Sequence, residues 1–294
     1  MAITAATLTS DFSGFLTAEQ AGPIFEETRR RSAVQQLARQ IPLGIGGTEI
    51  TVVTGKPTAG WVAEGGQKPA SEGSRELVSM DPHKLATIVV VSAEVVRANP
   101  AGYMNDIRLD IAEAFANAFD SAVLYGTNSP FPAALNDGTK TVEFGTGTSI
   151  YQDLVAGLAL LVADGKRLTG FAFGLEVEPL LLAAEDGNNR PLFIDATTET
   201  VVDGQMVGRL LGRRAILDEG LDSGTSRGFG GDWTKIAWGQ IGGINYDIST
   251  EAAVTIDGQL VSLWEHNLVA VRAETEYGLV IGDVEAFVEF TDAA

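Results

Sequence analysis

The sequence predicts an α+β protein, a class in which helices and strands are mixed without the regular alternation of a doubly wound sheet. Three features lead to this prediction: a long helical pattern that ends near Gly126, a glycine-rich and β-prone stretch over residues 46–82, and a strand-rich part after Pro191. The 294 residues are enough to bury a substantial core without crosslinks. Because the chain contains no cysteine, disulfides, thiolate nucleophiles and cysteine-containing zinc sites are excluded.

The formal net charge of −19 argues against direct binding to nucleic acid, because affinity for phosphates comes mainly from clustered Lys and Arg. The acidity is interpreted first as a solubility feature. A second interpretation is an acidic surface along which enclosed DNA slides without sticking, which suits a container. Residues 1–12 have no signal-peptide pattern. The longest apolar stretch, residues 154–163, is shorter than the ~20 residues that span a bilayer, so no membrane partner is expected.

The N-terminal residues 17–40 predict a broken or bent helix. A capping box begins at Thr17, and apolar residues follow at loosely helical spacing. The basic cluster at residues 29–31 is interpreted as a solvated helix face without a special role. Glycines within residues 44–47 interrupt the helical pattern and predict a turn.

Residues 46–82 predict a long hairpin with a flexible tip. Two short β-prone pieces, residues 49–53 and 77–80, flank a middle that is rich in glycine and proline and poor in large apolar side chains. At ~3.3 Å per residue, such a hairpin reaches roughly 40 Å. A lone two-stranded hairpin is marginally stable in water, so we expect it to lie against another subunit.

The body is predicted to begin with a buried strand at residues 83–92. A long helix is predicted to follow Asn99-Pro100 and to end near Tyr125, before Gly126. The buried face of this helix is expected to carry Ile107, Ile111, Ala114, Phe115, Ala118 and Ala122.

Further along, a helix is predicted from Ile150 to Asp164, after an N-cap at Ser149 and before Gly165. The remaining elements are predicted as a strand at 170–173, a helix at 176–186, and strands at 236–238, 244–248, 268–275 and 287–290.

One catalytic pattern is present. Residues 224–228 match G-x-S-x-G around Ser226, and Asp247 and His266 follow in the chain order of an α/β-hydrolase triad. A nucleophile elbow requires an apolar strand before the serine and a helix after it, whereas acidic residues precede Ser226 and glycines follow it. We interpret these residues as a flexible Gly-Ser loop and expect no hydrolase.

No cofactor or metal site is expected. The glycines of residues 44–47 and 165 lack the rest of a phosphate loop. The two histidines, His83 and His266, are too far apart to suggest a metal motif and are interpreted as polar partners at strand edges. Residues 186–189 lack the spacing and the final glutamate of a calcium loop.

Several short segments, in this order, resemble the major capsid proteins of tailed phages, which have the Hong Kong ninety-seven type fold that encapsulin shells share. Trp61-Val62-Ala63-Glu64-Gly65 resembles the W-x-x-E segment of the family's extended loop. The later segments are Met80 to Ala86, Val90-Val91-Ser92-Ala93-Glu94, Arg190-Pro191-Leu192, Leu210-Leu211-Gly212 and Gly231-Asp232-Trp233. Each segment is weak alone, and their shared order makes the resemblance specific.

The resemblance implies a division of the chain. The parts are an N-terminal arm (1–45), an extended loop (46–82), a peripheral domain with a long spine helix (83–127 and 241–285) and an axial domain (128–240 and 286–294). It implies a major capsid protein whose many copies assemble into pentamers and hexamers of an icosahedral virion shell around double-stranded DNA. Implied partners are a separate scaffolding protein, a portal and a maturation protease, with assembly in the host bacterial cytoplasm. An encapsulin-like nanocompartment is the alternative.

The expected function is therefore assembly and not catalysis. We expect Trp61 to be the apolar anchor of an intersubunit contact in the extended loop, with Glu64, Lys68 and Arg75 as charges at its rim. One branch of the family joins subunits by a Lys-to-Asn isopeptide bond, which invites comparison with Lys68. No asparagine or assisting acid is identified for it, and a solvated or salt-bridged lysine is the alternative.

Overall fold

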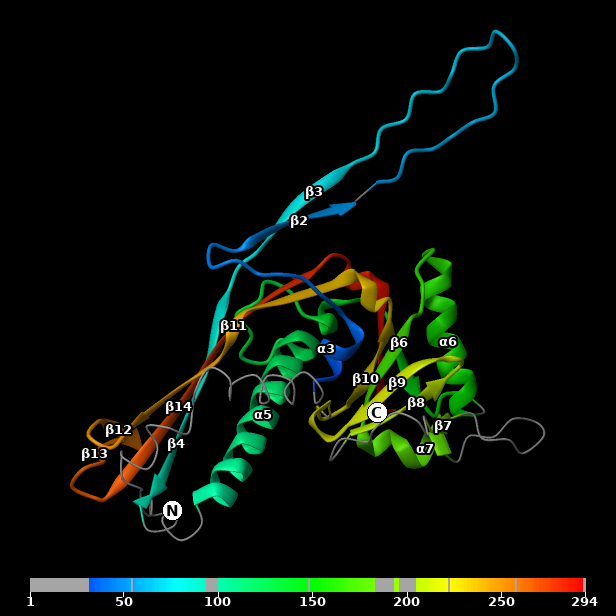
Figure 1. Ribbon diagram of the computed structural model, residues 1–294. Coiled ribbons are helices and arrows are strands. Elements are labelled where there is room, and N and C mark those ends of the chain that lie inside the picture. The colour runs from blue at the N-terminus through cyan, green and yellow to red at the C-terminus, as the bar shows by residue number, and fades with distance from the viewer. Residues whose placement is uncertain are drawn as a thin grey trace.

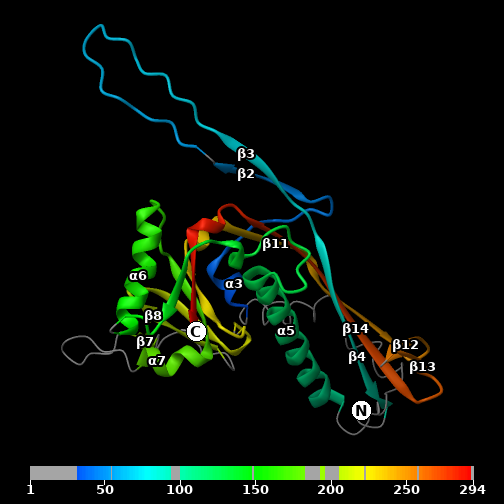
Figure 2. The same cartoon turned by 180° about the vertical axis from the view of Figure 1, so that it is seen from behind.

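The computed structural model describes residues 32–53, 55–93, 100–147, 149–182, 193–195, 205–221, 223–256 and 258–292; for residues 100–106, 108, 193–195 and 205–206 it describes the backbone only. Figure 1 and Figure 2 show a body made of two sheets, each accompanied by helices, and a long hairpin that projects from this body. The predicted α+β class is confirmed.

The first sheet has four strands and lies beside the longest helix (Figure 1). Its order is β1 (Arg39–Gln40), β11 (Ile236–Ser249), β14 (Leu268–Ile281) and β4 (His83–Ser92). Only the short β1 runs parallel to its neighbour. A small hairpin, β12 (Ala253–Ile256) and β13 (Gln259–Ser262), lies at the far end of the β11–β14 pair.

Strand β11 contains both of the pieces predicted as strand at 236–238 and 244–248, so both predictions are confirmed and the two pieces belong to one strand. The register of β11 against β14 shifts between Ile241 and Asn245, and Gly242 within this interval has a φ of 65°. A glycine at positive φ lets an irregularity form inside the strand, because it has no Cβ that would clash.

Strand β4 has the predicted bounds, but the prediction that it is buried is only partly right. Burial alternates along most of the strand, Ile88 is half exposed, and full burial is reached only at Val91 and Ser92. The reason is that β4 lies at the edge of its sheet and packs one face against the core, so alternate side chains point outward.

Helix α5 (Pro100–Tyr125) has the predicted length and ends before Gly126, whose φ is 64°. Ile107, Ile111, Phe115 and Ala122 are buried as predicted, whereas Ala114 and Ala118 are exposed, against the prediction. The sheet of β4 and β14 covers one side of the helix, and the core around α3 covers another side. The buried face is therefore wider than the predicted stripe and turned away from these two alanines, and it includes Phe119 and Asp120.

The second sheet has seven strands. Its order is β5 (Thr141–Phe144), β15 (Phe287–Asp292), β10 (Ser226–Gly231), β6 (Gly170–Gly174), β9 (Arg213–Asp218), β8 (Gln205–Leu210) and β7 (Phe193–Asp195). Helices α6 (Ile150–Ala163) and α7 (Glu178–Leu182) accompany it (Figure 2). The short 3-10 turns are Leu135–Asp137, Leu175–Val177, Glu219–Leu221, Trp233–Lys235 and Val284–Ala286.

Strand β10 corrects the prediction of a flexible loop at residues 224–228. Ser226 and Gly228 lie in this strand, between β15 and β6. A Cβ on Gly228 would lie 2.2 Å from the carbonyl oxygen of Ala172, and one on Gly230 would lie 2.8 Å from the ring of Phe171. The glycines allow close packing against aromatic side chains, which is why a segment that looks like a loop is a central strand.

Helix α6 confirms the predicted helix at 150–164 within one residue. It ends in a Schellman motif, in which Gly165 N–H bonds to Val162 O at 2.9 Å and Lys166 N–H to Leu161 O at 2.9 Å. Ser149 is the N-cap residue, but its side chain makes no capping hydrogen bond. The buried carboxylate of Asp153 instead accepts the N–H groups of Gly145 and Gly147, each at 2.8 Å, and so closes the turn before the helix.

The other two helical predictions are shorter in the structure. Within 176–186, the described residues form a 3-10 turn and α7, and residues 183–190 lie outside the described part of the chain. Within 17–40, the described helix is α3 (Ala33–Leu37), which starts at the N-cap Ser32 and is followed by β1. The prediction that the helix reaches residue 40 is wrong, because the chain there joins the edge of the first sheet, with Ile41 N–H bonded to Trp238 O at 2.8 Å.

Candidate intersubunit site

The extended loop is a regular hairpin only in its half nearest the body. Strands β2 (Thr48–Val53) and β3 (Arg75–Met80) pair antiparallel over six residues, from Thr48 opposite Met80 to Val53 opposite Arg75. The β-branched Thr, Ile and Val residues of β2 suit a strand. The short β-prone pieces of the sequence thus form the predicted hairpin.

The distal half of the extended loop crosses from one leg to the other with few hydrogen bonds. Gly55 N–H donates to Ser74 O at 3.1 Å, and Ser71 Oγ donates to Thr58 O at 2.8 Å. Pro57 and Pro69 have no N–H and therefore cannot contribute a donor to a ladder. At the tip, Gly66 N–H bonds to Ala63 O at 2.9 Å, and Gly65 has the positive φ, 78°, that a type II turn requires at its third residue.

All four residues predicted at the contact are exposed in the subunit, and Trp61 is fully exposed at 106%. The side chains of Trp61, Glu64, Lys68 and Arg75 make no hydrogen bond or ion pair with another residue in the described part of the chain. Every residue from 56 to 74 is exposed as well. The subunit therefore presents an indole ring and three charges on a segment that its own body does not cover.

The base of the extended loop, in contrast, is firmly packed. Met80 is completely buried and forms a small apolar cluster with Leu43 and Val280, against which Ile50 and Val78 also pack. Under this cluster, Gly239 of β11 lies directly opposite Gly278 of β14. The hairpin is thus held at its base by burial of apolar side chains and is free over its distal half.

A second contact fixes the chain just before the extended loop. The carboxylate of Asp120, in α5, accepts Ser32 Oγ–H at 2.7 Å, Ala33 N–H at 2.9 Å and Val34 N–H at 3.2 Å. It therefore satisfies N–H groups at the start of α3 that have no partner within that helix. Burial raises the pKa of Asp120 to about 7, although the hydrogen bonds from Ser32 and the backbone lower it.

The residues of the hydrolase pattern do not meet. Ser226 is buried in β10 of the seven-stranded sheet, whereas Asp247 lies in β11 and pairs with Arg272 at 2.6 Å. His266 lies between β13 and β14, where its Nδ1 is 2.9 Å from Ser262 O, and Figure 1 shows the β12–β13 hairpin well away from β10. Within the described residues there is no cluster of His, Asp and Glu fit for a metal ion, and none of the helices described is both long and apolar enough to cross a bilayer.

Comparison with known proteins decides the family. The model of the phage capsid family matches residues 14–292. The chain is 43% identical to the probable major capsid protein of Mycobacterium phage D29 over 289 residues, which covers 96% of this chain and 91% of that protein. It is 42% identical, with the same coverage, to the corresponding protein of Mycobacterium phage L5. The chain belongs to the phage capsid family.

The fold of this capsid protein agrees with the family. A solved chain from Microbacterium phage Oxtober96 superimposes with a TM-score of 0.69 at 23% identity, covering 90% of this chain and 91% of that chain. The resemblance to tailed-phage major capsid proteins with the Hong Kong ninety-seven type fold is confirmed, and the protein is a capsid component of a virion.

Two features of the capsid subunit were not predicted from the sequence. The first is the pair Gly239 and Gly278, for which a signal exists, because a glycine inside an apolar strand often marks close approach of another segment. The second is Asp120, whose partner Ser32 lies 88 residues away in the chain. One acidic residue among several in a long helix carries no sign of such a partner.

Proposed function

We propose that this major capsid protein assembles into pentamers and hexamers of an icosahedral shell that encloses a double-stranded DNA genome, and that its extended loop joins neighbouring copies. The division proposed is an N-terminal arm to residue 45, the extended loop (46–82), a peripheral domain (83–127 and 241–285) and an axial domain (the remainder). We assign it a purely structural role without catalysis.

The observation that carries this proposal is the contrast between the two halves of the extended loop. Its base is packed around the fully buried Met80, whereas residues 56–74 are exposed and carry the fully exposed Trp61. An indole that stays in water lacks the stabilisation that burial of roughly 150–250 Å² of aromatic surface would give. A segment of this composition gains stability when it packs on a partner, and in a shell of identical subunits the partner is another copy.

In this proposal Trp61 is the apolar anchor of the contact, and Glu64, Lys68 and Arg75 lie at its rim. Buried aromatic residues typically dominate the free energy of association, whereas exposed ion pairs contribute about 0–1 kcal/mol each. The rim charges then set which orientation is favoured, and they make the contact sensitive to salt.

The proposed partners beyond other copies follow from the family. They are a separate scaffolding protein, a portal, a maturation protease, and DNA that is enclosed without sequence-specific contact, with assembly in the host bacterial cytoplasm. The net charge of −19 supports enclosure without tight binding, because a strongly acidic subunit repels phosphates.

Electron microscopy of purified particles, combined with nucleic-acid staining, tests the proposal. Icosahedral shells that contain DNA when produced during infection are the expected result. Small shells that hold a protein cargo and no DNA would instead support an encapsulin-like nanocompartment, and a monomer that never assembles would contradict both.

A further inference from the structure

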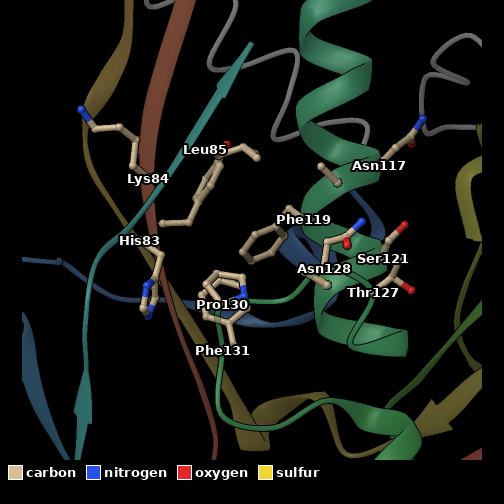
Figure 3. Close-up of a pocket in the computed structure, with 13 residues that line it drawn as sticks. His83, Lys84, Leu85, Asn117, Phe119, Ser121, Thr127, Asn128, Pro130 and Phe131 are labelled. Atoms are coloured by element: carbon tan, nitrogen blue, oxygen red, sulfur yellow. The ribbon is translucent and has the colours of Figure 1, made fainter. Parts of the chain in front are cut away.

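A pocket opens on the body beside α5 (Figure 3). Three segments form it: the start of β4, the C-terminal half of α5, and the loop after α5. Its volume is about 460 Å³, within the ~300–1,000 Å³ of typical ligand pockets. The lining residues are His83, Lys84, Leu85, Asn117, Ala118, Phe119, Ser121, Ala122, Thr127, Asn128, Pro130, Phe131 and Tyr277.

The floor of the pocket is aromatic. Phe119 and Tyr277 are both 2% exposed, and their ring centroids are 4.9 Å apart. Phe131 stands edge-on to Phe119, with centroids 6.1 Å apart, and His83 stands edge-on to Phe131 at 5.6 Å. Figure 3 shows the rings of Phe119, Phe131 and His83 near one another in the pocket. An additional aromatic ring would find edge and face partners at the separations that aromatic pairs prefer.

The rim is polar and only weakly charged. Asn117, Ser121, Thr127 and Asn128 supply amide and hydroxyl groups on the side formed by α5 and the loop after it (Figure 3). Lys84 lies on the side of the pocket formed by β4. Its side chain is half exposed, and its Nζ is 3.3 Å from Glu274 Oε2. An occupant that is apolar with one polar hydrogen-bond donor fits this combination better than an ion or a highly polar ligand.

Trp61 has these properties. Its ring is large and apolar, and its single N–H requires an acceptor when it is buried. Glu64, three residues further along the same tip, carries a charge opposite to that of Lys84. The distal backbone of the extended loop also has few internal hydrogen bonds, so the amides and hydroxyls of the rim offer partners for it.

The extended loop of the same subunit does not supply the occupant. The pocket lies at the start of β4, next to the base of the extended loop, and both views show the tip of that loop pointing away from α5 (Figure 1, Figure 2). We propose that the Trp61 side chain of a second copy of this chain occupies the pocket between α5 and the start of β4. This inference rests on the proposed function of the extended loop, since it names the surface that the loop contacts.

A pocket-filling substitution tests this site with a matched control. Ala118 lines the pocket and Ala114 lies one turn earlier on α5, and both are exposed. Ala118→Trp should fill the pocket and raise the subunit concentration needed for assembly by about 30-fold, which corresponds to ~2 kcal/mol at ~1.4 kcal/mol per tenfold change. Ala114→Trp should assemble like the wild type. Wild-type assembly by Ala118→Trp would overturn the inference.

Crosslinking within assembled particles gives a second readout that does not depend on a bulky substitution. Because the natural chain has no cysteine, Ala63→Cys combined with Thr127→Cys provides two thiols, one beside Trp61 and one at the pocket rim. A short bismaleimide reagent should produce dimers and higher multimers from this pocket pair. The control pair, Ala63→Cys with Glu251→Cys near the distal β12–β13 hairpin, should stay monomeric on a denaturing gel.

The outcomes separate this inference from the proposed function. Multimers from the control pair and none from the pocket pair would overturn the docking site while leaving the extended loop as an intersubunit contact. If Trp61→Ala particles form normally, the proposed function of the loop is itself contradicted. If Trp61→Ala prevents assembly and Ala118→Trp does not, only the docking site is wrong.

Discussion

Gly239 and Gly278 face each other as direct cross-strand partners in β11 and β14, and the side chains of Leu43 and Met80 fill the space above them. A Cβ on Gly278 would lie 2.8 Å from Met80 Cγ and 2.9 Å from Leu43 Cδ2. Because neither glycine has a Cβ, the sheet leaves room for Leu43 and Met80, and these side chains pack the base of the extended loop onto it.

Replacing Gly278 by alanine should disturb the packing of Leu43 and Met80 on the sheet. The added methyl group forces Leu43 and Met80 to shift, and overpacking of a core typically lowers the free energy of unfolding by about 1–3 kcal/mol. Chemical denaturation of unassembled subunits measures this change, and limited proteolysis reports release of the loop's base. Gly243→Ala is the control, because a Cβ there meets no atom within 4 Å. Equal stability of the two variants would contradict the claim that this packing requires glycine at position 278.

The burial of the Asp120 carboxyl group should make the stability of the subunit depend on pH. Because burial raises the pKa of Asp120 from 3.8 to about 7, the folded subunit binds this proton more tightly than the unfolded chain does. The contribution of Asp120 to the free energy of unfolding is therefore largest below pH 3.8 and decreases as pH rises toward about 7. The change should exceed ~1 kcal/mol, because one pKa unit corresponds to ~1.4 kcal/mol.

Asp120→Asn isolates this effect from the other titrating groups. Thermal unfolding of both proteins at several pH values between 4 and 8 should give a difference in stability that varies with pH, since the variant lacks the titrating group. A constant difference across this range would show that Asp120 does not titrate there.

Lys68 should remain uncrosslinked in mature particles. It is exposed on the extended loop, and no asparagine and acid that could complete an isopeptide bond have been identified for it. Boiled particles should therefore run as a single monomer band on a denaturing gel. A ladder of covalent multimers that disappears in Lys68→Arg particles would contradict this prediction.

Much of the extended loop could be predicted from sequence because its signals are local. Strand propensity in residues 49–53 and 77–80, and prolines and glycines between them, specify a hairpin with an irregular tip. Helix α5 could be predicted equally well, because Gly126 ends it and its apolar residues repeat at helical spacing. In both cases the residues that decide the structure lie within one element.

Features that depend on distant residues could not be predicted in the same way. Strand β10 resembles a loop in sequence, and its glycines make sense only when Phe171 and Ala172 of β6 are placed beside them. The exposed Ala118 was assigned to a buried face because helical periodicity does not say which neighbours cover a helix. The pocket next to it involves three separate segments, so no single stretch of sequence indicates it.

The substitution Trp61→Ala tests the central claim most directly, with Trp61→Phe as the control that keeps an aromatic ring. Because Trp61 makes no contact with its own body, Trp61→Ala subunits should keep the wild-type melting temperature and circular dichroism spectrum. Negative-stain electron microscopy and sedimentation should then show few or misshapen shells for Trp61→Ala and normal shells for Trp61→Phe. Complete shells at wild-type yield from Trp61→Ala subunits would contradict the claim that the extended loop joins neighbouring copies through this residue.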